Sequence, residues 1–437
     1  MKIRHVVSTA VLAAALMLGS AAAAQPARTA SSELLDRVAE DFVRMTLEAG
    51  EREPGYVDAY YGPVHLMDTA KAAPRPVSVL RKEADRLMTL VVAAKDKQLS
   101  PDERRRKLFL KGQIKAAQTR LAMIAGDKFS FEDEAQGLFG VRPVIKPLKS
   151  YDPILARIDK LVPGKGDLAA RVDAFQNRYV IPTDKVEAVM QAGIAACKAK
   201  TEEHIKLPAG ERFDMEFVTK KPWSGYNWYK GGAHSLIQIN TDLPIYISRA
   251  LDLGCHEGYP GHHVLNALLE EKLTKDKGWV EFSVYPLFSP QSFIAEGSAN
   301  FGIELAFPGK AKTEFERDKL YPLAGLDPKT AEAYGELQDA KAALSSSGNT
   351  IAALYLSGKM TKEQAVRALM KYTLYSRGGA EKRVSFIETY RSYVINYNIG
   401  QDMVRDHVYR AGKTQDARWK AMERVISEPT VPADLRK

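Results

Sequence analysis

The segment from His256 to His263, with the sequence HEGYPGHH, contains the residue types of a catalytic zinc site. Such a site needs three protein ligands, a fourth position open to water, and a carboxylate that accepts the proton of that water. Imidazole and carboxylate ligands in this pattern favour zinc. We therefore predict that His256 is a metal ligand and that the adjacent Glu257 is the general base.

The spacing of these histidines differs from the common helical zinc motif, in which two histidines four residues apart share one face. Four positions after His256 the chain has Pro260, and the next histidines are His262 and His263. Proline lacks an N–H donor and Gly261 permits unusual dihedral angles, so this pair predicts a bulge that interrupts the helix. The bulge would bring His262 round to the metal, and His263 is the alternative second ligand.

The third ligand is expected on a later helix. Glu296 is the one charged residue in a stretch of small and apolar residues from Phe293 to Ile303. An isolated carboxylate in such surroundings is costly unless it is paired or bound to a metal. Glu304 is the alternative, either as the ligand or as a group that orients a histidine.

Other residues are candidates for binding the substrate or its transition state. A tetrahedral oxyanion needs a donor, and Arg391, Tyr393 and Tyr397 lie together at the end of the last strong helical pattern. Their alternative role is an ordinary aromatic core with a surface arginine.

Residues 235–240 alternate between apolar and polar side chains, which predicts a strand just before the metal motif. Such a strand could hold an extended peptide by edge pairing, with Gln238 and Asn240 as its polar contacts. Tyr229 precedes this strand and is expected to line the pocket. The alternative is a plain half-buried strand.

Helical periodicity dominates the rest of the chain. We predict helices at residues 77–94, 101–124, 184–205, 293–305, 328–344, 351–356, 362–375 and 384–393. A second strand is predicted at 212–218, a loop at 223–232, and a helix that begins at Asp242 and runs into His256. The expected fold is mainly α, with a small β-sheet beside the metal-binding helix. An N-terminal helical region, 25–206, and a catalytic region, 207–437, are expected to form one compact unit.

The N-terminus predicts export. Lys2 and Arg4 precede an apolar stretch, and the small residues that follow predict a signal peptide, 1–24, cut after Ala24. No cysteine follows the stretch, which argues against a lipid anchor, and no comparable apolar run occurs later. We expect a periplasmic or secreted protein without a stable membrane anchor.

The net charge bears on which partners the protein binds, and the cysteine content bears on whether it contains a disulfide. The net charge of +9 is modest for 437 residues, and the basic run 104–107 fits a solvated helix face, so nucleic acid is not an expected partner. Cys197 and Cys255 are the only cysteines. The sequence leaves open whether they form a disulfide.

HEGYPGHH, followed by FIAEGSANFGIE, resembles the bacterial DUF885 proteins, which are grouped with the gluzincin metallopeptidases. Their pattern is close to H-E-x-x-P-G-H-H with a later E-G-W-A-x-Y-x-E, and the resemblance covers about residues 210–405. It implies one zinc ion on His256, His262 and Glu296, with Glu257 as general base. It also implies a mostly helical, channel-like fold, that is, a large helical metallopeptidase-like fold with a central cleft. Ser298 and Phe301 replace the tryptophan and tyrosine of the family pattern, which puts the substrate in doubt more than the chemistry.

The expected function is an exported zinc-dependent hydrolase, most simply a metallopeptidase that cleaves peptides with a zinc-activated water. The alternatives are a zinc hydrolase of a non-peptide amide or a cell-wall fragment, and a non-catalytic exported binding protein. The sequence indicates no oligomeric state.

Overall fold

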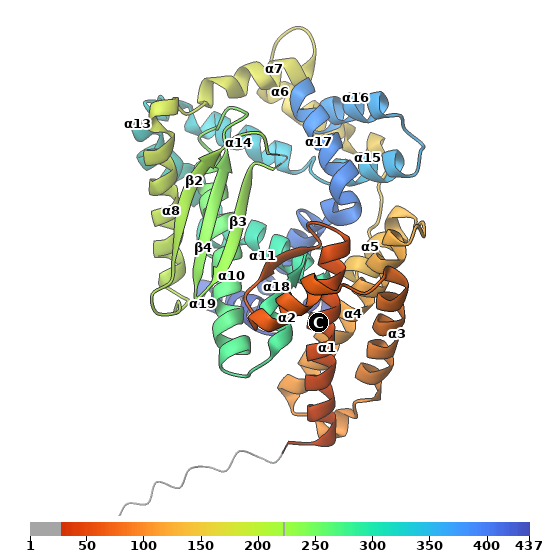
Figure 1. Ribbon diagram of the computed structural model, residues 1–437. Helices are drawn as coiled ribbons and strands as arrows, with labels where there is room; N and C mark the ends of the chain where they lie inside the picture. Colours follow the sequence, from red (N-terminus) through yellow and green to blue (C-terminus); the bar gives the residue numbers. More distant parts are fainter. Residues whose placement is uncertain (1–27, 222) are drawn as a thin grey trace, which may run out of the picture.

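Helices form most of the protein, and one small three-stranded sheet lies beside them (Figure 1). This computed structural model describes residues 28–221 and 223–437, so the predicted signal peptide, 1–24, lies outside the described residues. The prediction of a mainly α fold with a small sheet is confirmed. None of the helices in the described ranges combines the length and the apolar character that a bilayer crossing requires.

The N-terminal helices pack on one another. They are α1 (Ala30–Arg52), α2 (Val64–Ala72), α3 (Val77–Ala93), α4 (Pro101–Ile124) and α5 (Phe131–Phe139). Helix α4 begins with a capping box, in which Ser100 and Glu103 each accept the other's backbone N–H. Its buried face contacts α1, α3 and α5. The helices predicted at 77–94 and 101–124 are thus confirmed to within one residue.

The three-stranded sheet consists of β2 (Arg212–Val218), β3 (Gly225–Gly231) and β4 (His234–Asn240). Strand β4 is central, parallel to β2 and antiparallel to β3. The strands predicted at 212–218 and 235–240 are confirmed. The loop predicted at 223–232 is wrong over most of its length, because its aromatic residues pair with β4 as strand β3.

The segment that carries the metal motif follows the sheet. Helix α9 (Arg249–Leu253) continues into a π-helical segment, Gly254–Gly258, and α10 (His262–Leu269) begins after a break. The helix start predicted at Asp242 is wrong. Its carboxylate accepts the backbone N–H groups of Lys220 and Lys221 at 2.8 and 3.3 Å instead of capping a helix.

A later helix packs against the segment that carries the motif, and a second, two-stranded pair lies elsewhere in the fold. Helix α11 (Pro290–Ala306) contacts the π-helical segment and α18 (Ile399–Ala411). Strand β1 (Val57–Tyr60) pairs with β5 (Val284–Pro286) in a separate antiparallel pair. Segments that are far apart in the sequence therefore meet at the motif.

The buried apolar residues of the described ranges form two clusters. Each cluster contains residues of both the expected N-terminal region, 25–206, and the expected catalytic region, 207–437. The smaller cluster combines side chains from residues 151–172 with side chains from residues 337–384. The larger cluster likewise runs from Leu35 to Leu435. The other α-helices of the described ranges are α6 (Asp152–Leu161), α7 (Leu168–Gln176), α8 (Val186–Glu202), α12 (Ala311–Phe315), α13 (Tyr321–Ala324), α14 (Ala331–Ala342), α15 (Ser347–Leu356), α16 (Lys362–Tyr372), α17 (Arg377–Tyr390) and α19 (Gln415–Ser427).

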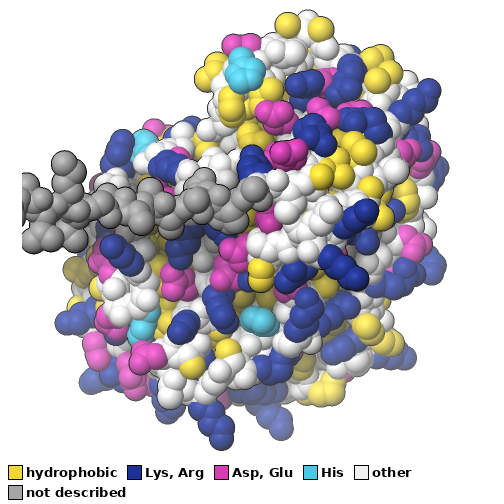
Figure 2. Space-filling view, turned by 90° about the horizontal axis from the view of Figure 1, so that it is seen from below, with side chains coloured by type: hydrophobic (Ala, Val, Ile, Leu, Met, Phe, Trp, Pro, Cys, Tyr) yellow, Lys and Arg dark blue, Asp and Glu magenta, His cyan; other side chains and the backbone are white. Residues whose placement is uncertain are grey.

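Charges of both signs cover the surface. On the face in Figure 2, Lys and Arg side chains are interspersed with Asp and Glu rather than gathered in one stripe. The basic run at 104–107 is not the uniformly solvated helix face that was expected, because Arg106 is buried against Glu281. Arg105 of the same run pairs with Glu428.

Candidate metal centre

Three predicted ligands converge on one point. His256 Nε2 lies 3.2 Å from His262 Nε2, and Glu296 Oε2 lies 3.2 and 3.6 Å from these two nitrogens. Zinc bonds of 2.0–2.1 Å in tetrahedral geometry place ligand atoms about 3.3 Å apart. The spacing of the three atoms therefore fits a zinc ion between them.

The predicted bulge is present, and it explains how His262 reaches His256. The π-helical turn Gly254–Gly258 widens the helix, and such turns are frequent at functional sites. The chain then folds back so closely that a β-carbon at Gly261 would overlap the carbonyl oxygen of His256. A residue with a side chain at position 261 would therefore push His262 away from the centre.

His256 is oriented by Asn300, a residue that the sequence reasoning did not assign. The Nδ1 of His256 lies 2.9 Å from Asn300 Oδ1, and the Asn300 amide donates to the Tyr397 carbonyl at 2.7 Å. Because the Asn300 amide nitrogen donates to Tyr397, the Asn300 oxygen is the atom that faces His256 and accepts the proton on its Nδ1. The Nε2 of His256 is then free to bind a metal. The available signal was that Asn300 lies one helical turn after Glu296.

Glu296 is buried and carries an oxygen that lacks a partner. Its Oε1 accepts the Tyr393 hydroxyl at 2.8 Å, whereas its Oε2 has no hydrogen bond in the described part of the chain. Burial opposes ionisation, but the two histidines outweigh burial and hold the pKa of Glu296 well below its ordinary value. An ionised oxygen that makes no hydrogen bond and faces two imidazole nitrogens suits a bound cation.

The charge of Glu296 also acts on His262. Burial disfavours the charged imidazole, yet the nearby carboxylates outweigh this effect and raise the pKa of His262 to about 9. The pocket therefore stabilises positive charge at the point where the three ligand atoms meet.

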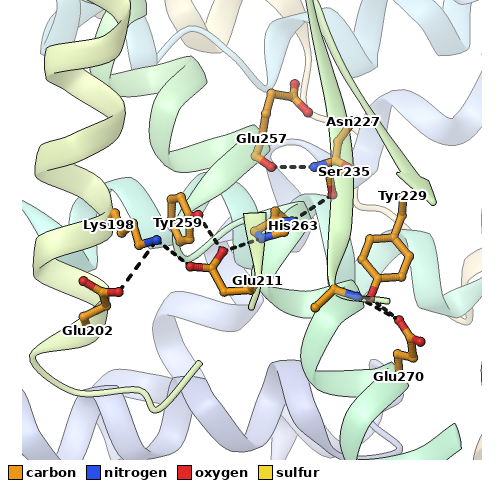
Figure 3. A network of polar contacts seen from close by, with 11 residues as sticks. Lys198, Glu202, Glu211, Asn227, Tyr229, Ser235, Glu257, Tyr259, His263 and Glu270 are labelled. Atoms are coloured by element: carbon orange, nitrogen blue, oxygen red, sulfur yellow. Dashed lines mark hydrogen bonds and ion pairs between the residues drawn. The ribbon is translucent and has the colours of Figure 1, made fainter. Parts of the chain in front are cut away.

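Glu257 lies beside this point. One carboxylate oxygen of Glu257 and one ring nitrogen each of His256 and His262 lie within 4.8 Å of one another. The amide of Asn227 on β3 donates to the Glu257 carbonyl at 2.8 Å (Figure 3). A β-carbon at Gly225 would come within 2.9 Å of Glu257 Oε1, so this glycine leaves room for the carboxylate.

His263, the alternative second ligand, is held elsewhere. Its Nδ1 lies 2.8 Å from Ser235 Oγ and its Nε2 lies 2.8 Å from Glu211 Oε2, so both ring nitrogens are occupied (Figure 3). Glu211 also accepts from Tyr259 and pairs with Lys198. Burial opposes its ionisation, but the bonds to His263, Lys198 and Tyr259 outweigh burial and lower the pKa of Glu211 to about 2. His263 therefore belongs to a structural network between α10 and the sheet.

Glu304, the alternative third ligand, lies away from the centre. Its carboxylate accepts Arg405 Nε at 2.8 Å and the Tyr409 hydroxyl at 2.6 Å, both from α18. It neither meets the histidines nor orients them.

The three residues predicted to donate to an oxyanion differ in the partners of their polar groups. Arg391 is paired with the buried Glu134 at 2.8 Å, and its role as an oxyanion donor stays a prediction. Tyr393 donates to Glu296. The Tyr397 hydroxyl has no partner in the described ranges, and its ring lies near-parallel to that of His256, with centroids 6.5 Å apart. Burial raises the pKa of Tyr393 and Tyr397 well above the ordinary value, so both remain proton donors.

The prediction of edge pairing by the strand at 235–240 is wrong, because β4 has a neighbouring strand on both sides. Gln238 contacts Glu216 and Trp228 across the sheet. Asn240 donates to the carbonyls of residues 221 and 223 in the adjoining turn.

Tyr229, expected to line the pocket, is buried, and its hydroxyl donates to Glu270. Its hydroxyl, like the amides of Gln238 and Asn240, is thus bound within the protein and does not face the centre.

A disulfide joins Cys197 on α8 to Cys255, with their Cα atoms 5.3 Å apart. Cys255 directly precedes His256. The bond therefore ties the π-helical segment to a helix that lies outside the motif.

Comparison with known proteins finds a structure of similar fold but assigns no activity. No protein-family model and no curated protein sequence matches this chain. The structure is similar to that of a candidate lipoprotein from Colwellia psychrerythraea, with a TM-score of 0.51 and 14% identity over 94% of this chain and 76% of that one. A candidate lipoprotein of unknown function from Shewanella oneidensis gives a TM-score of 0.46 and 15% identity over 85% of this chain and 75% of that one.

Proposed function

We propose that this protein is an exported zinc-dependent hydrolase that cleaves peptide bonds. The observation that carries the proposal is the convergence of His256, His262 and Glu296, with ligand atoms 3.2 to 3.6 Å apart, beside the carboxylate of Glu257. Two nitrogens, one carboxylate and a nearby base make up the donor set of a hydrolytic zinc site. A relationship to the DUF885 metallopeptidases is part of the same proposal.

The centre would supply Lewis acidity: a bound zinc ion polarises a carbonyl and lowers the pKa of water. Glu257 then acts as the proton carrier. It accepts the proton of the attacking water, whose oxygen forms a bond to the carbonyl carbon, and delivers that proton to the amide nitrogen as the C–N bond breaks. The position of Glu257 next to His256, with its backbone held by Asn227, supports this role.

Tyr397 is the residue proposed to donate to the oxyanion. Its hydroxyl is unpaired among the described residues, it is half-buried, and its high pKa keeps the proton on the oxygen. Tyr393 supports the centre indirectly, since its hydroxyl holds the second oxygen of Glu296.

The deciding experiment compares the purified protein with Glu257→Gln. We expect one zinc per chain in both proteins, and hydrolysis of a mixed peptide library by the wild type alone. Equal activity of the two would remove Glu257 from the mechanism. A zinc-loaded wild type that cleaves N-acetylmuramoyl amides but no peptide would favour a cell-wall substrate.

A further inference from the structure

A cavity of about 470 Å³ lies at the end of strand β3 that is farther from the metal centre. Gly225, the first residue of β3, is the one next to the Glu257 carboxylate, whereas Gly231, the last residue, lines the cavity. A strand advances about 3.3 Å per residue, so the two glycines lie about 20 Å apart. The cavity has the volume of a pocket for a small ligand, and it is separate from the metal centre.

The wall formed by the turn between β3 and β4 is held by a buried carboxylate. Gly231, Gly232 and Ala233 have φ angles of 80°, 64° and 53°, and positive φ is uncommon for a residue with a side chain. The Glu270 carboxylate accepts the backbone N–H of Gly232 at 3.0 Å and that of Ala233 at 3.3 Å. It also accepts the hydroxyl of Tyr229 (Figure 3). Sparsely populated conformations persist where the surrounding structure fixes them, and they are frequent at ligand-binding sites.

A second wall of the cavity is apolar. It comes from Tyr60 and Tyr61 at the end of β1 and from Val64 and Met67 of α2. The side chain of Val64 is 72% exposed, so its apolar surface is available to a ligand. A β-carbon at Gly231 would come within 3.0 Å of Tyr61, so the glycine allows the two walls to meet. An apolar group of a ligand would fit against this second wall.

Lys230 supplies the unbalanced charge of the cavity. The charged residues that line it are Lys230 and Glu270. Glu270 is paired with Lys275 at 3.3 Å, and its oxygens are occupied by the turn. Lys230 is exposed, its Nζ lies 5.7 Å from the centre of the Trp228 ring, and it forms no ion pair with any residue of 28–221 and 223–437. The cavity therefore favours a ligand with one negative charge beside an apolar group.

We propose that this cavity binds a small carboxylic acid with an apolar chain, with the carboxylate at Lys230 and the chain against Val64 and Met67. The carboxy-terminal residue of a peptide and a free aliphatic acid both have this chemistry. A lysine ammonium is a point charge with rotatable donors, so it selects a ligand by charge rather than by a fixed geometry. The site goes beyond the proposed function, since it requires neither zinc nor Glu257.

Calorimetry on the zinc-loaded wild type measures the binding. The probes are N-acetyl-leucine, which represents a peptide terminus, octanoate, which represents an aliphatic acid, and the uncharged amide of each. We expect at least one acid to bind about tenfold more tightly than its own amide. A preference for N-acetyl-leucine would support a peptide terminus as the ligand, and a preference for octanoate would support an aliphatic acid.

Three variants test the assignment of the walls. Lys230→Gln should abolish the difference between acid and amide, whereas Lys165→Gln, which removes another exposed lysine without an ion pair in the described ranges, should keep it. Val64→Asp should weaken binding of the acid by about tenfold or more, because it places a negative charge beside the carboxylate. Val64 and Lys230 are both exposed, so neither substitution should disturb the fold.

A carboxylate is also a possible ligand of the metal centre, so the titration is repeated with His262→Ala, which is expected to lack zinc. The preference for the acid should persist in that protein. Its loss there would place the carboxylate on the metal and overturn the proposal. Equal binding of acids and amides by the wild type, or an unchanged preference in Lys230→Gln, would overturn it as well.

Discussion

His262 and His263 are adjacent in the sequence, but their rings serve different partners. His262 Nε2 lies 3.2 Å from His256 Nε2, whereas His263 Nε2 lies 2.8 Å from Glu211 Oε2. Two residues of the same type in one helical turn thus provide a matched pair of variants for testing the centre.

His262→Ala should abolish zinc binding and leave the fold intact, because it removes a ligand. His263→Ala should keep one zinc per chain but lower the free energy of unfolding by about 1–3 kcal/mol, because it leaves Glu211 and Ser235 without a buried partner. Elemental analysis and denaturant unfolding measure both effects. Loss of zinc in His263→Ala alone would reverse the assignment of the two histidines.

Asn300→Ala should weaken zinc binding by about 10- to 100-fold, because His256 loses the group that fixes its ring and tautomer. Competition with a chelator measures the affinity. Glu304→Gln is the control on the same helix, since its carboxylate is held by Arg405 and Tyr409, and the variant should bind zinc as the wild type does. An Asn300→Ala protein with wild-type affinity would show that His256 needs no such support.

Zinc affinity should rise with pH up to about 9, the pKa of His262 without metal. Below that pH the ring carries a proton, which zinc must displace, so affinity should increase about tenfold for each pH unit and level off above the pKa. Proton release on zinc binding, measured in two buffers of different ionisation enthalpy, checks this. Release of no proton at pH 7 would contradict a raised pKa.

Replacing both Cys197 and Cys255 with alanine should lower the free energy of unfolding by about 4 kcal/mol, the loop-closure value for their sequence separation. Zinc affinity should fall as well, because Cys255 adjoins His256 and the bond ties its segment to α8. Thermal unfolding and chelator competition report the two effects separately. Unchanged zinc affinity would limit the disulfide to a role in stability.

Tyr397→Phe should lower kcat by about 100- to 1,000-fold with zinc content unchanged, as expected for the loss of an oxyanion donor. Tyr409→Phe, whose hydroxyl contacts Glu304 on the surface side of α11, should have wild-type kcat. Steady-state kinetics on the same peptide measure both. Full kcat in Tyr397→Phe would show that a group other than Tyr397 donates to the oxyanion.

The sequence by itself determined the helical fold class, most helix positions, two strands of the sheet, and the residue types of the centre. Helical periodicity, capping residues and the Pro260-Gly261 break are local signals, because each arises within a few residues of chain. The position of a single carboxylate in an apolar helical stretch is also a local signal, and it identified Glu296 as a candidate ligand.

The tertiary structure decided which groups meet. It paired Gly225–Gly231 as a strand, placed β4 in the middle of the sheet, and bound Arg391 to Glu134, which is 257 residues away. It also brought Asn300 to His256. Such contacts join segments far apart in the sequence, and their free energy depends on burial and on the partners available, which no local pattern encodes.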